Sequence, residues 1–347
     1  MLIIELFKLL WIQIIYHKTL VIFRIENIGQ LDIIYSDAEI FKKSGYDVII
    51  LTRDPEKFDP TFLVFQSRLY IFIFQCLLYV AVSQNMRAPF LLSTEKIFLL
   101  PYGYFAKGIS LLRYRRKNYR NILVYNKAMK SYIKEFDPNI KSYTISYPKT
   151  RRTTISKRRV DKNLLIAPSY DDFTSLNSEA ITSIVEHADL QEYSFTLKSH
   201  PRYFNKSDPA YKNRLDVMSG KLNVITKFDN LNSFENYDTL VTDYSSIAYE
   251  GLNLGLKVIL YWSPNFYITG LNAFGVTSRL AYLRDYRVNS GFHILPKIRN
   301  ANELPFAIKD YGRKMNQGKA QKFLHDISNG EPEYNSVLEV LEENRFV

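Results

Sequence analysis

Short apolar runs alternate with stretches of helical spacing along the first 150 residues. Thr19–Phe23 is a β-branched and aromatic run, and the apolar residues of 32–44 recur at helical spacing up to Gly45. A second apolar run, Tyr46–Leu51, follows directly and ends at a turn sequence. This order predicts a strand, a helix capped by Gly45 and a second strand, which is the unit that builds parallel sheets.

The same alternation continues less regularly before a polar break. Ser67–Val82 predicts an apolar helix or a helix followed by a strand, Lys96–Leu100 predicts a strand, and Asn118–Phe136 predicts a helix. The segment 147–162 is basic, contains a proline and is rich in Ser and Thr. That composition is typical of a linker between two domains.

After the linker the alternation starts again, which predicts a second domain of the same kind. We therefore expect an α/β protein of two doubly wound domains, 1–150 and 163–347, that face a central cleft. The strands predicted in the second domain are Asn163–Ala167, Ser194–Leu197, Asn223–Ile225, Asp238–Val241 and Lys257–Tyr261, and the helices are Ser175–His187, Tyr249–Leu254 and Glu333–Glu343.

The composition adds a basic surface to this picture. The 347 residues include 46 Lys and Arg against 35 Asp and Glu, a formal net charge of +11. Basic clusters at 113–120 and 149–159 indicate either solvated faces or a surface for phosphate-bearing partners. No nucleic-acid-binding motif accompanies them, so we expect no nucleic acid partner. The single cysteine, Cys76, excludes a disulfide framework and a cysteine-based zinc site.

Two apolar segments are too short to span a bilayer. Residues 1–16 carry Glu5, Lys8 and Gln13 and lack a signal-peptide cleavage site, and Leu69–Val82 is interrupted by a glutamine. Residues 1–16 predict either an amphipathic helix on the membrane surface or a docked core helix. We expect a cytoplasmic protein that is peripheral on the inner face of the cell membrane.

The first chemical motif follows the predicted strand that ends at Leu197. Lys198, His200 and Arg202 stand together there, in the sequence Lys-Ser-His-Pro-Arg. An imidazole and two cations at a strand exit suit a diphosphate, because charged donors bind phosphate oxygens strongly. The alternative is a surface loop with incidental charges.

Two further motifs also follow strands. Asp243, Ser245 and Ser246 stand at a predicted helix start, where they serve as N-caps, as an anion site, or as both. Ser169 follows the first strand of the second domain and would border the cleft. The pair Asp171–Asp172 has no evident third ligand, so we expect no metal.

In order and spacing these motifs resemble the CDP-glycerol glycerophosphotransferases of teichoic acid and capsule synthesis. Thr242–Ser246, with the helix and strand that follow, resembles the Thr-Asp-Tyr-Ser-Ser signature of that family. Leu197–Arg202, Leu165–Tyr170 and Thr144–Lys149 are similar to its other segments. The resemblance implies a GT-B architecture without metal or cofactor. It also implies a CDP-activated donor in the second domain and transfer of a glycerol-phosphate-type group to a lipid-linked or polymeric anionic acceptor.

The resemblance also implies roles for single residues. His200 and Arg202 would contact the diphosphate, Ser245 and Ser246 would hold phosphoryl oxygens, and Asp243 would belong with His200 to the catalytic group. The family histidine proposed as general base is replaced here by Tyr102. A phenol with an ordinary pKa of about 10 is a weak base at neutral pH. Two alternatives therefore stay open: a GT-B glycosyltransferase that uses a nucleotide sugar, and a pseudoenzyme that only binds a donor.

Overall fold

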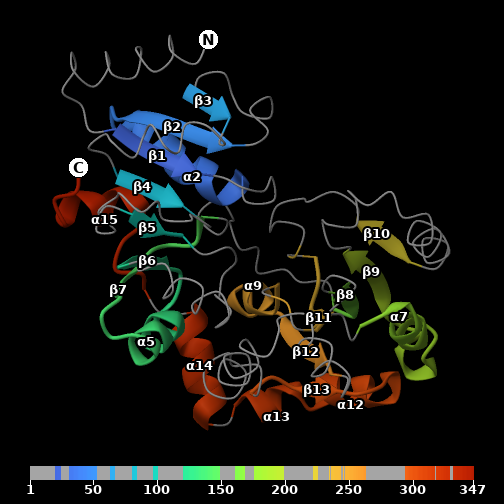
Figure 1. Cartoon of the computed structure of the whole chain (residues 1–347). Coiled ribbons are helices and arrows are strands. Elements are labelled where there is room, and N and C mark those ends of the chain that lie inside the picture. The colour runs from blue at the N-terminus through green and yellow to red at the C-terminus, as the bar shows by residue number, and fades with distance from the viewer. Residues whose placement is uncertain are drawn as a thin grey trace, which may run out of the picture. The chain divides into compact units, whose positions relative to one another are not determined.

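Figure 1 shows the computed structural model of the chain. The chain divides into two compact units. The first holds the described residues from Leu20 to Pro148 together with Glu331–Val347, and the second holds those from Asp161 to Ser328. The residues that the structure describes are 20–24, 31–52, 63–66, 80–83, 97–100, 120–148, 161–168, 176–198, 222–225, 234, 236–243, 245, 247–262, 294–316, 318–328 and 331–347.

The first unit contains a parallel sheet whose strand order within the described residues is β3-β2-β1-β4-β5-β6-β7. The chain builds this sheet outward from β1 in one direction and then continues from β4 in the other, as doubly wound sheets do. The strands are β1 (Leu20–Arg24), β2 (Asp47–Thr52), β3 (Leu63–Gln66), β4 (Val80–Ser83), β5 (Ile97–Leu99), β6 (Asn121–Val124) and β7 (Lys141–Thr144).

Helix α2 (Leu31–Lys43) joins β1 to β2 as the sequence predicts. Its buried residues Ile34, Ala38 and Phe41 form the stripe that faces the core. Gly45 has a φ of +85°, the left-handed conformation that favours glycine, so it ends the helix as expected.

The predicted helix over Asn118–Phe136 is wrong in its first part. Residues 121–124 form strand β6, and helix α5 (Lys127–Phe136) begins after it. All four residues of β6 are buried between two neighbouring strands, and this pairing outweighs the helical spacing of their apolar side chains. Of the predicted segment Ser67–Val82, the described residues belong to β4.

The prediction that assigns 163–347 to the second domain is wrong for its end. Glu331–Val347 belongs to the first unit. There the Tyr334 N–H donates to the Thr144 carbonyl at 3.0 Å, and the Tyr334 carbonyl accepts from the Ser146 N–H at 3.0 Å. The tail thus continues the hydrogen bonding of the first sheet beyond β7.

Helix α15 (Val337–Glu343) completes this attachment. Its first N–H, at Val337, donates to the buried carboxylate of Asp37 in α2 at 3.3 Å. Farther along, the Phe346 ring meets the Phe98 ring of β5 edge to face, with centroids 5.0 Å apart. An apolar tail helix needs a partner surface, and here the first unit supplies it, with Val337, Leu338, Val340 and Leu341 buried.

The second unit contains a parallel sheet of order β10-β9-β8-β11-β12-β13 within the described residues. Counted from its own first strand, this is the order 3-2-1-4-5-6 of doubly wound nucleotide-binding sheets. The strands are β8 (Asn163–Ala167), β9 (Ser194–Lys198), β10 (Asn223–Ile225), β11 (Thr239–Thr242), β12 (Lys257–Tyr261) and β13 (Lys297–Ile298).

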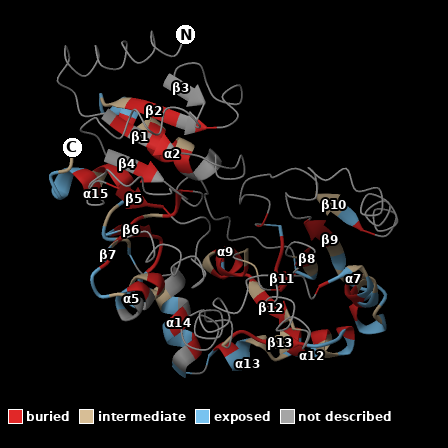
Figure 2. Cartoon of the chain, viewed as in Figure 1, coloured by how far each residue is buried: buried red, intermediate tan, exposed pale blue. Residues whose placement is uncertain are grey.

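Helices cover both faces of this second sheet. On one face, Ile166, Val241 and Ile259 pack against α7 and α12 in a buried apolar cluster (Figure 2). On the other face lies α9, which contacts β11 and β12. The helices are α7 (Ser178–Val185), α9 (Ile247–Asn253), α12 (Leu304–Lys309), α13 (Tyr311–Met315) and α14 (Gly318–Ser328), with 3₁₀ turns at Ala188–Leu190 and Ala301–Glu303.

A glycine lets α9 approach the sheet closely. A Cβ atom at Gly251 would lie 2.7 Å from Leu240 Cδ2 and 3.2 Å from Val258 Cγ2. Any larger residue would push the helix or these buried side chains aside. The close contact fixes the position of α9 and therefore of its first residues.

Candidate functional site

Parallel pairing brings the carboxyl ends of the strands in the second sheet into one row. Lys198 pairs with Ile225, while Thr242 pairs with Ala167 on one side and with Leu260 on the other. The strand order reverses between β8 and β11, so the topological switch point lies between Ala167 and Thr242. Doubly wound folds bind ligands just beyond this point.

Two hydrogen bonds fix the end of β11 at the switch point. The Thr242 hydroxyl donates to the Ala167 carbonyl at 2.6 Å, and both residues are buried. The carboxylate of Asp243, only 2% exposed, accepts a long hydrogen bond of 3.5 Å from the Leu176 N–H. The segment that follows β11 is thereby tied to the segment that precedes α7.

Ser245 organises the start of α9. Its hydroxyl oxygen accepts from the Ile247 N–H at 3.4 Å, its carbonyl accepts from the Ala248 N–H at 3.2 Å, and its own N–H donates to the Asp243 carbonyl at 2.8 Å. The predicted capping role of Ser245 is thus present. An accepting hydroxyl keeps its O–H proton, so partly buried Ser245 can still donate to another group.

Lys198 ends β9 beside the switch point. The residue is 8% exposed, and its Nζ lies 5.6 Å from the centroid of the buried Phe234 ring. The face of an aromatic ring attracts a cation, which offsets part of the cost of taking the ammonium out of water. The structure therefore holds a positive charge near the carboxyl edge of the sheet.

The far end of the same edge carries residues that the motif search missed. Lys297 Nζ lies 5.2 Å from the Trp262 ring centroid, and burial lowers the pKa of this lysine. Burial, with the carboxylates of Glu179 and Glu303, raises the pKa of Tyr261. Tyr261, Trp262 and Lys297 lie within or directly after the last two strands, and this position is the sequence signal that could have identified them as site candidates.

The structure brings three of the predicted site residues to one sheet edge: Lys198, Asp243 and Ser245. The other predicted site residues lie outside the described part of the chain, and so do the Asp171–Asp172 pair and the apolar segment 1–16. These site residues are Tyr102, Ser169, His200, Arg202 and Ser246.

Two absences among the described residues bear on metal binding and on membrane crossing. No group of three or more His, Cys, Asp or Glu side chains among them is arranged to hold a metal ion. Within the same residues, no helix combines the length and the apolar character that crossing a membrane requires.

Comparison with known proteins gives matches in structure alone. No protein-family model and no curated protein matches the sequence. The wall teichoic acid polymerase TagF is 15% identical with a TM-score of 0.59, over 90% of this chain and 85% of that one. The co-structure of S. aureus MnaA with UDP is 11% identical with a TM-score of 0.54, over 95% and 98%.

A glycosyltransferase from Rickettsia africae ESF-5 also matches, with 13% identity and a TM-score of 0.50 over 94% of this chain and 97% of that one. The likeness extends over nearly the whole chain in each case and includes both units. The protein therefore has an α/β fold of the GT-B type, as the sequence predicts.

Proposed function

We propose that this protein is a transferase that moves a polyol-phosphate group from a CDP-activated donor to a hydroxyl of a lipid-linked or polymeric anionic acceptor. The observation that carries the proposal is the tied switch point of the second sheet, where Asp243 and Thr242 fix the strand ends next to the cation of Lys198. Anionic nucleotides bind at such points in doubly wound sheets. TagF was also solved after soaking with CDPG, which supports a cytidine donor.

In this proposal an acceptor hydroxyl attacks the β-phosphorus of the donor, and CMP leaves with the electrons of the broken P–O bond. The hydroxyl of Ser245 and the ammonium of Lys198 stabilise the charge that builds on the phosphoryl oxygens. We assign His200 and Arg202 to the same diphosphate on the basis of their motif, with Ser246 and Ser169 at its border. Tyr102 is our candidate for the group that accepts the hydroxyl proton, a role that only its phenolate form can fill.

For Asp243 the structure favours a positioning role over the catalytic role that the family resemblance implies. A carboxylate that is 2% exposed and accepts from the Leu176 N–H is placed to hold the loop before α7, and not to meet a substrate. We therefore propose Asp243 as a positioning residue, which sets the path from β11 into α9. We further propose that the reaction needs no metal and takes place at the cytoplasmic membrane surface.

A nucleotide-sugar glycosyltransferase is the second candidate. The structural match to MnaA, which was solved with UDP, favours a uridine nucleotide. A thermal-shift panel with CDP-glycerol, CDP-ribitol and UDP-sugars separates the two candidates. We expect a rise in melting temperature with cytidine nucleotides only, and a rise with uridine nucleotides only would overturn the cytidine assignment.

Turnover of the stabilising nucleotide then tests the chemistry. We expect His200→Ala to lower turnover by about 10²–10³, as loss of a transition-state hydrogen-bond donor does. The matched control is His325→Ala, at an exposed position on α14. Equal turnover in both variants would refute the site, EDTA-sensitive turnover would refute the metal-free route, and donor binding without turnover would favour the pseudoenzyme.

A further inference from the structure

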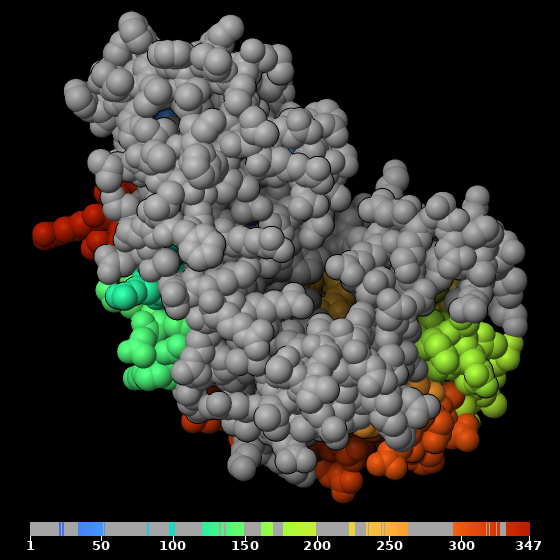
Figure 3. All heavy atoms as spheres, in the orientation of Figure 1, coloured from blue at the N-terminus to red at the C-terminus, as the bar shows by residue number. Residues whose placement is uncertain are grey.

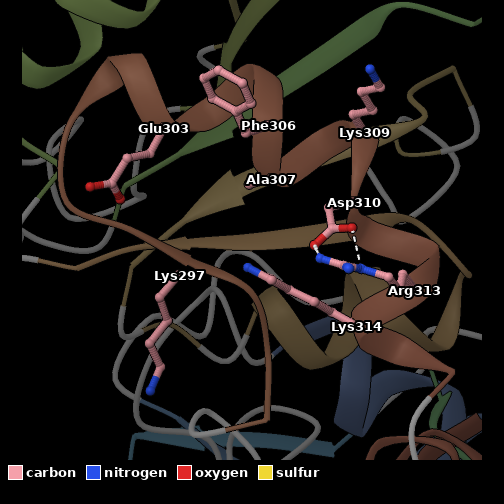
Figure 4. A pocket seen from close by; sticks show the side chains of 8 residues that line it. All are labelled: Lys297, Glu303, Phe306, Ala307, Lys309, Asp310, Arg313 and Lys314. Carbon is pink, nitrogen blue, oxygen red and sulfur yellow. Dashed lines mark hydrogen bonds and ion pairs between the residues drawn. The ribbon is translucent and has the colours of Figure 1, made fainter.

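The outer side of α12 and α13 is an unusual surface for this protein. Phe306 is 71% exposed, and among the described residues it is the large hydrophobic residue that stands exposed. Lys309, Arg313 and Lys314 are also exposed, and together with Phe306 they line one pocket (Figure 4). We refer to these four residues as the α12–α13 patch. The combination of an apolar ring with several cations matches the chemistry of an interface that offers both anionic and apolar groups.

Core packing fixes the direction in which this patch faces. Leu304, Ala307 and Ile308 of α12 are buried in the apolar cluster of the second sheet, and Met315 of α13 is buried as well. The two short helices cannot turn Phe306 inward without exposing these side chains. Figure 3 shows α12 and α13, in orange, at the lower rim of the visible surface.

The pocket carries a net positive charge, because four basic residues line it against two acidic ones, and both acidic residues also have partners. Asp310 is held by Arg313 through two contacts, Nε to Oδ1 at 2.6 Å and a second guanidinium nitrogen to Oδ2 at 2.9 Å. Glu303 accepts from the backbone N–H of Arg299 at 2.8 Å. The guanidinium keeps further N–H groups for an outside phosphate.

We propose that the α12–α13 patch docks on an anionic membrane surface, with Phe306 at the boundary between headgroups and acyl chains and the three cations on lipid phosphates. In Figure 4, Phe306 and Lys309 extend to the same side of α12. An aromatic ring flanked by lysines is what interfacial segments present to lipid. A soluble phosphate polymer would use the cations alone, so the exposed ring favours the bilayer.

This proposal rests on the membrane location that the proposed function includes. Vesicle sedimentation with the full chain tests it without any assay of catalysis, so the docking surface can fail while the transferase activity stands. Vesicles of phosphatidylcholine with phosphatidylglycerol are compared with pure phosphatidylcholine. We expect Phe306→Ala to lower the partition coefficient about ten-fold. Lys309→Ala with Lys314→Ala should lower it about 25-fold, about five-fold for each lysine.

The matched control is Lys134→Ala with Lys322→Ala, which removes the same charge from exposed positions on α5 and α14. It should change partition by less than about two-fold, because surface charges act only within a Debye length. An equal loss of vesicle partition in the patch and control variants would overturn the proposal, because binding would then depend on net charge and not on this patch.

A tryptophan reporter tests the depth of Phe306 directly. In a Trp11→Phe background, Phe306→Trp should show a blue-shifted emission when anionic vesicles are added, relative to the same background with Phe306 intact. Unchanged emission in a vesicle-bound protein contradicts insertion. If the lysine variants lose binding to soluble polyphosphate but keep vesicle partition, the patch serves a polymer and the proposal is wrong.

Discussion

Helices α5 and α9 begin in equivalent places, directly after a strand at the carboxyl edge of their own sheets, yet they are built differently. Asn126 caps α5 with a 2.8 Å hydrogen bond from the Met129 N–H and is itself 1% exposed. Ser245 caps α9 through a bond of 3.4 Å and is partly accessible. Beside it the buried Asp243 is tied to Leu176, in front of a different helix.

This difference indicates different roles for the two helix starts, one in the fold and one in binding. In the first unit the polar group at the helix start is buried and committed to the helix, so it serves the fold. In the second unit the buried Asp243 holds the segment before the helix, and the hydroxyl of Ser245 makes only a long capping bond and can still donate. Binding sites are preorganised in this way: buried contacts hold the residue in place, and its donor group stays available to the ligand.

Deleting Glu331–Val347 should cause the largest difference between the two units, because it should unfold the first unit and leave the second folded. The first unit would lose the buried side chains of α15 and the Phe346 ring. At about 1.5–3 kcal/mol for each large apolar side chain, the loss is comparable to the whole stability of a domain. Hydrogen exchange should show lost protection in β5 and β6 and retained protection in β11 and β12. Retained protection in both sheets would mean that the tail is dispensable.

Asp243→Ala should destabilise the second unit by about 1–3 kcal/mol, because it removes a buried hydrogen-bonded acceptor. Urea unfolding measures this loss, and a donor-binding titration should show weaker binding because the path into α9 is less fixed. Asp243→Asn keeps one acceptor oxygen and should recover part of both effects. If Asp243→Ala binds the donor like the unchanged protein, its positioning role is wrong.

Asn126→Ala should cost about 1 kcal/mol of stability, the usual value of a good N-cap. The change lies in the first unit, so the affinity for the nucleotide donor should stay the same. Asn126→Ser is the matched rescue, since serine also caps well. A loss of donor affinity in Asn126→Ala would break the comparison, because the α5 cap would then serve binding as well.

The largely buried strands β8 and β12 are apolar runs and were predictable from the sequence at their observed bounds. The short strand β10 was predicted at its observed bounds as well, although none of its residues is fully buried. Buried parallel strands read as such runs, and helix α2 was predictable from its stripe and Gly45. Strand β6 was not, because its four residues continue into the helical spacing of α5. The return of α15 was not predictable either, since an apolar helix fits any complementary surface.

For the site, the ends of the predicted strands indicated candidate residues, but the sequence did not reveal which of the distant segments contact one another. The sequence places Lys198, Asp243 and Ser245 each after a strand, and the structure brings them to one edge. The bond from Thr242 to Ala167 and the one from Leu176 to Asp243 join residues that are far apart along the chain. Such links depend on strand order and register, which a single sequence does not reveal.

Ser245→Ala should have the smallest effect on stability and the most informative one on function. Its capping bond is 3.4 Å long and partly accessible, so its loss should cost less than the 1 kcal/mol expected for Asn126→Ala. If the hydroxyl donates to the phosphoryl group in the transition state, turnover should nevertheless fall about 10²-fold. Ser245→Thr keeps both the cap and the O–H group, and should restore turnover toward that of the unchanged protein. Turnover and urea unfolding are measured on the same samples of both variants. A fall in turnover that only follows the fall in stability would assign Ser245 to the fold, as Asn126 is, and would remove the difference between the two helix starts.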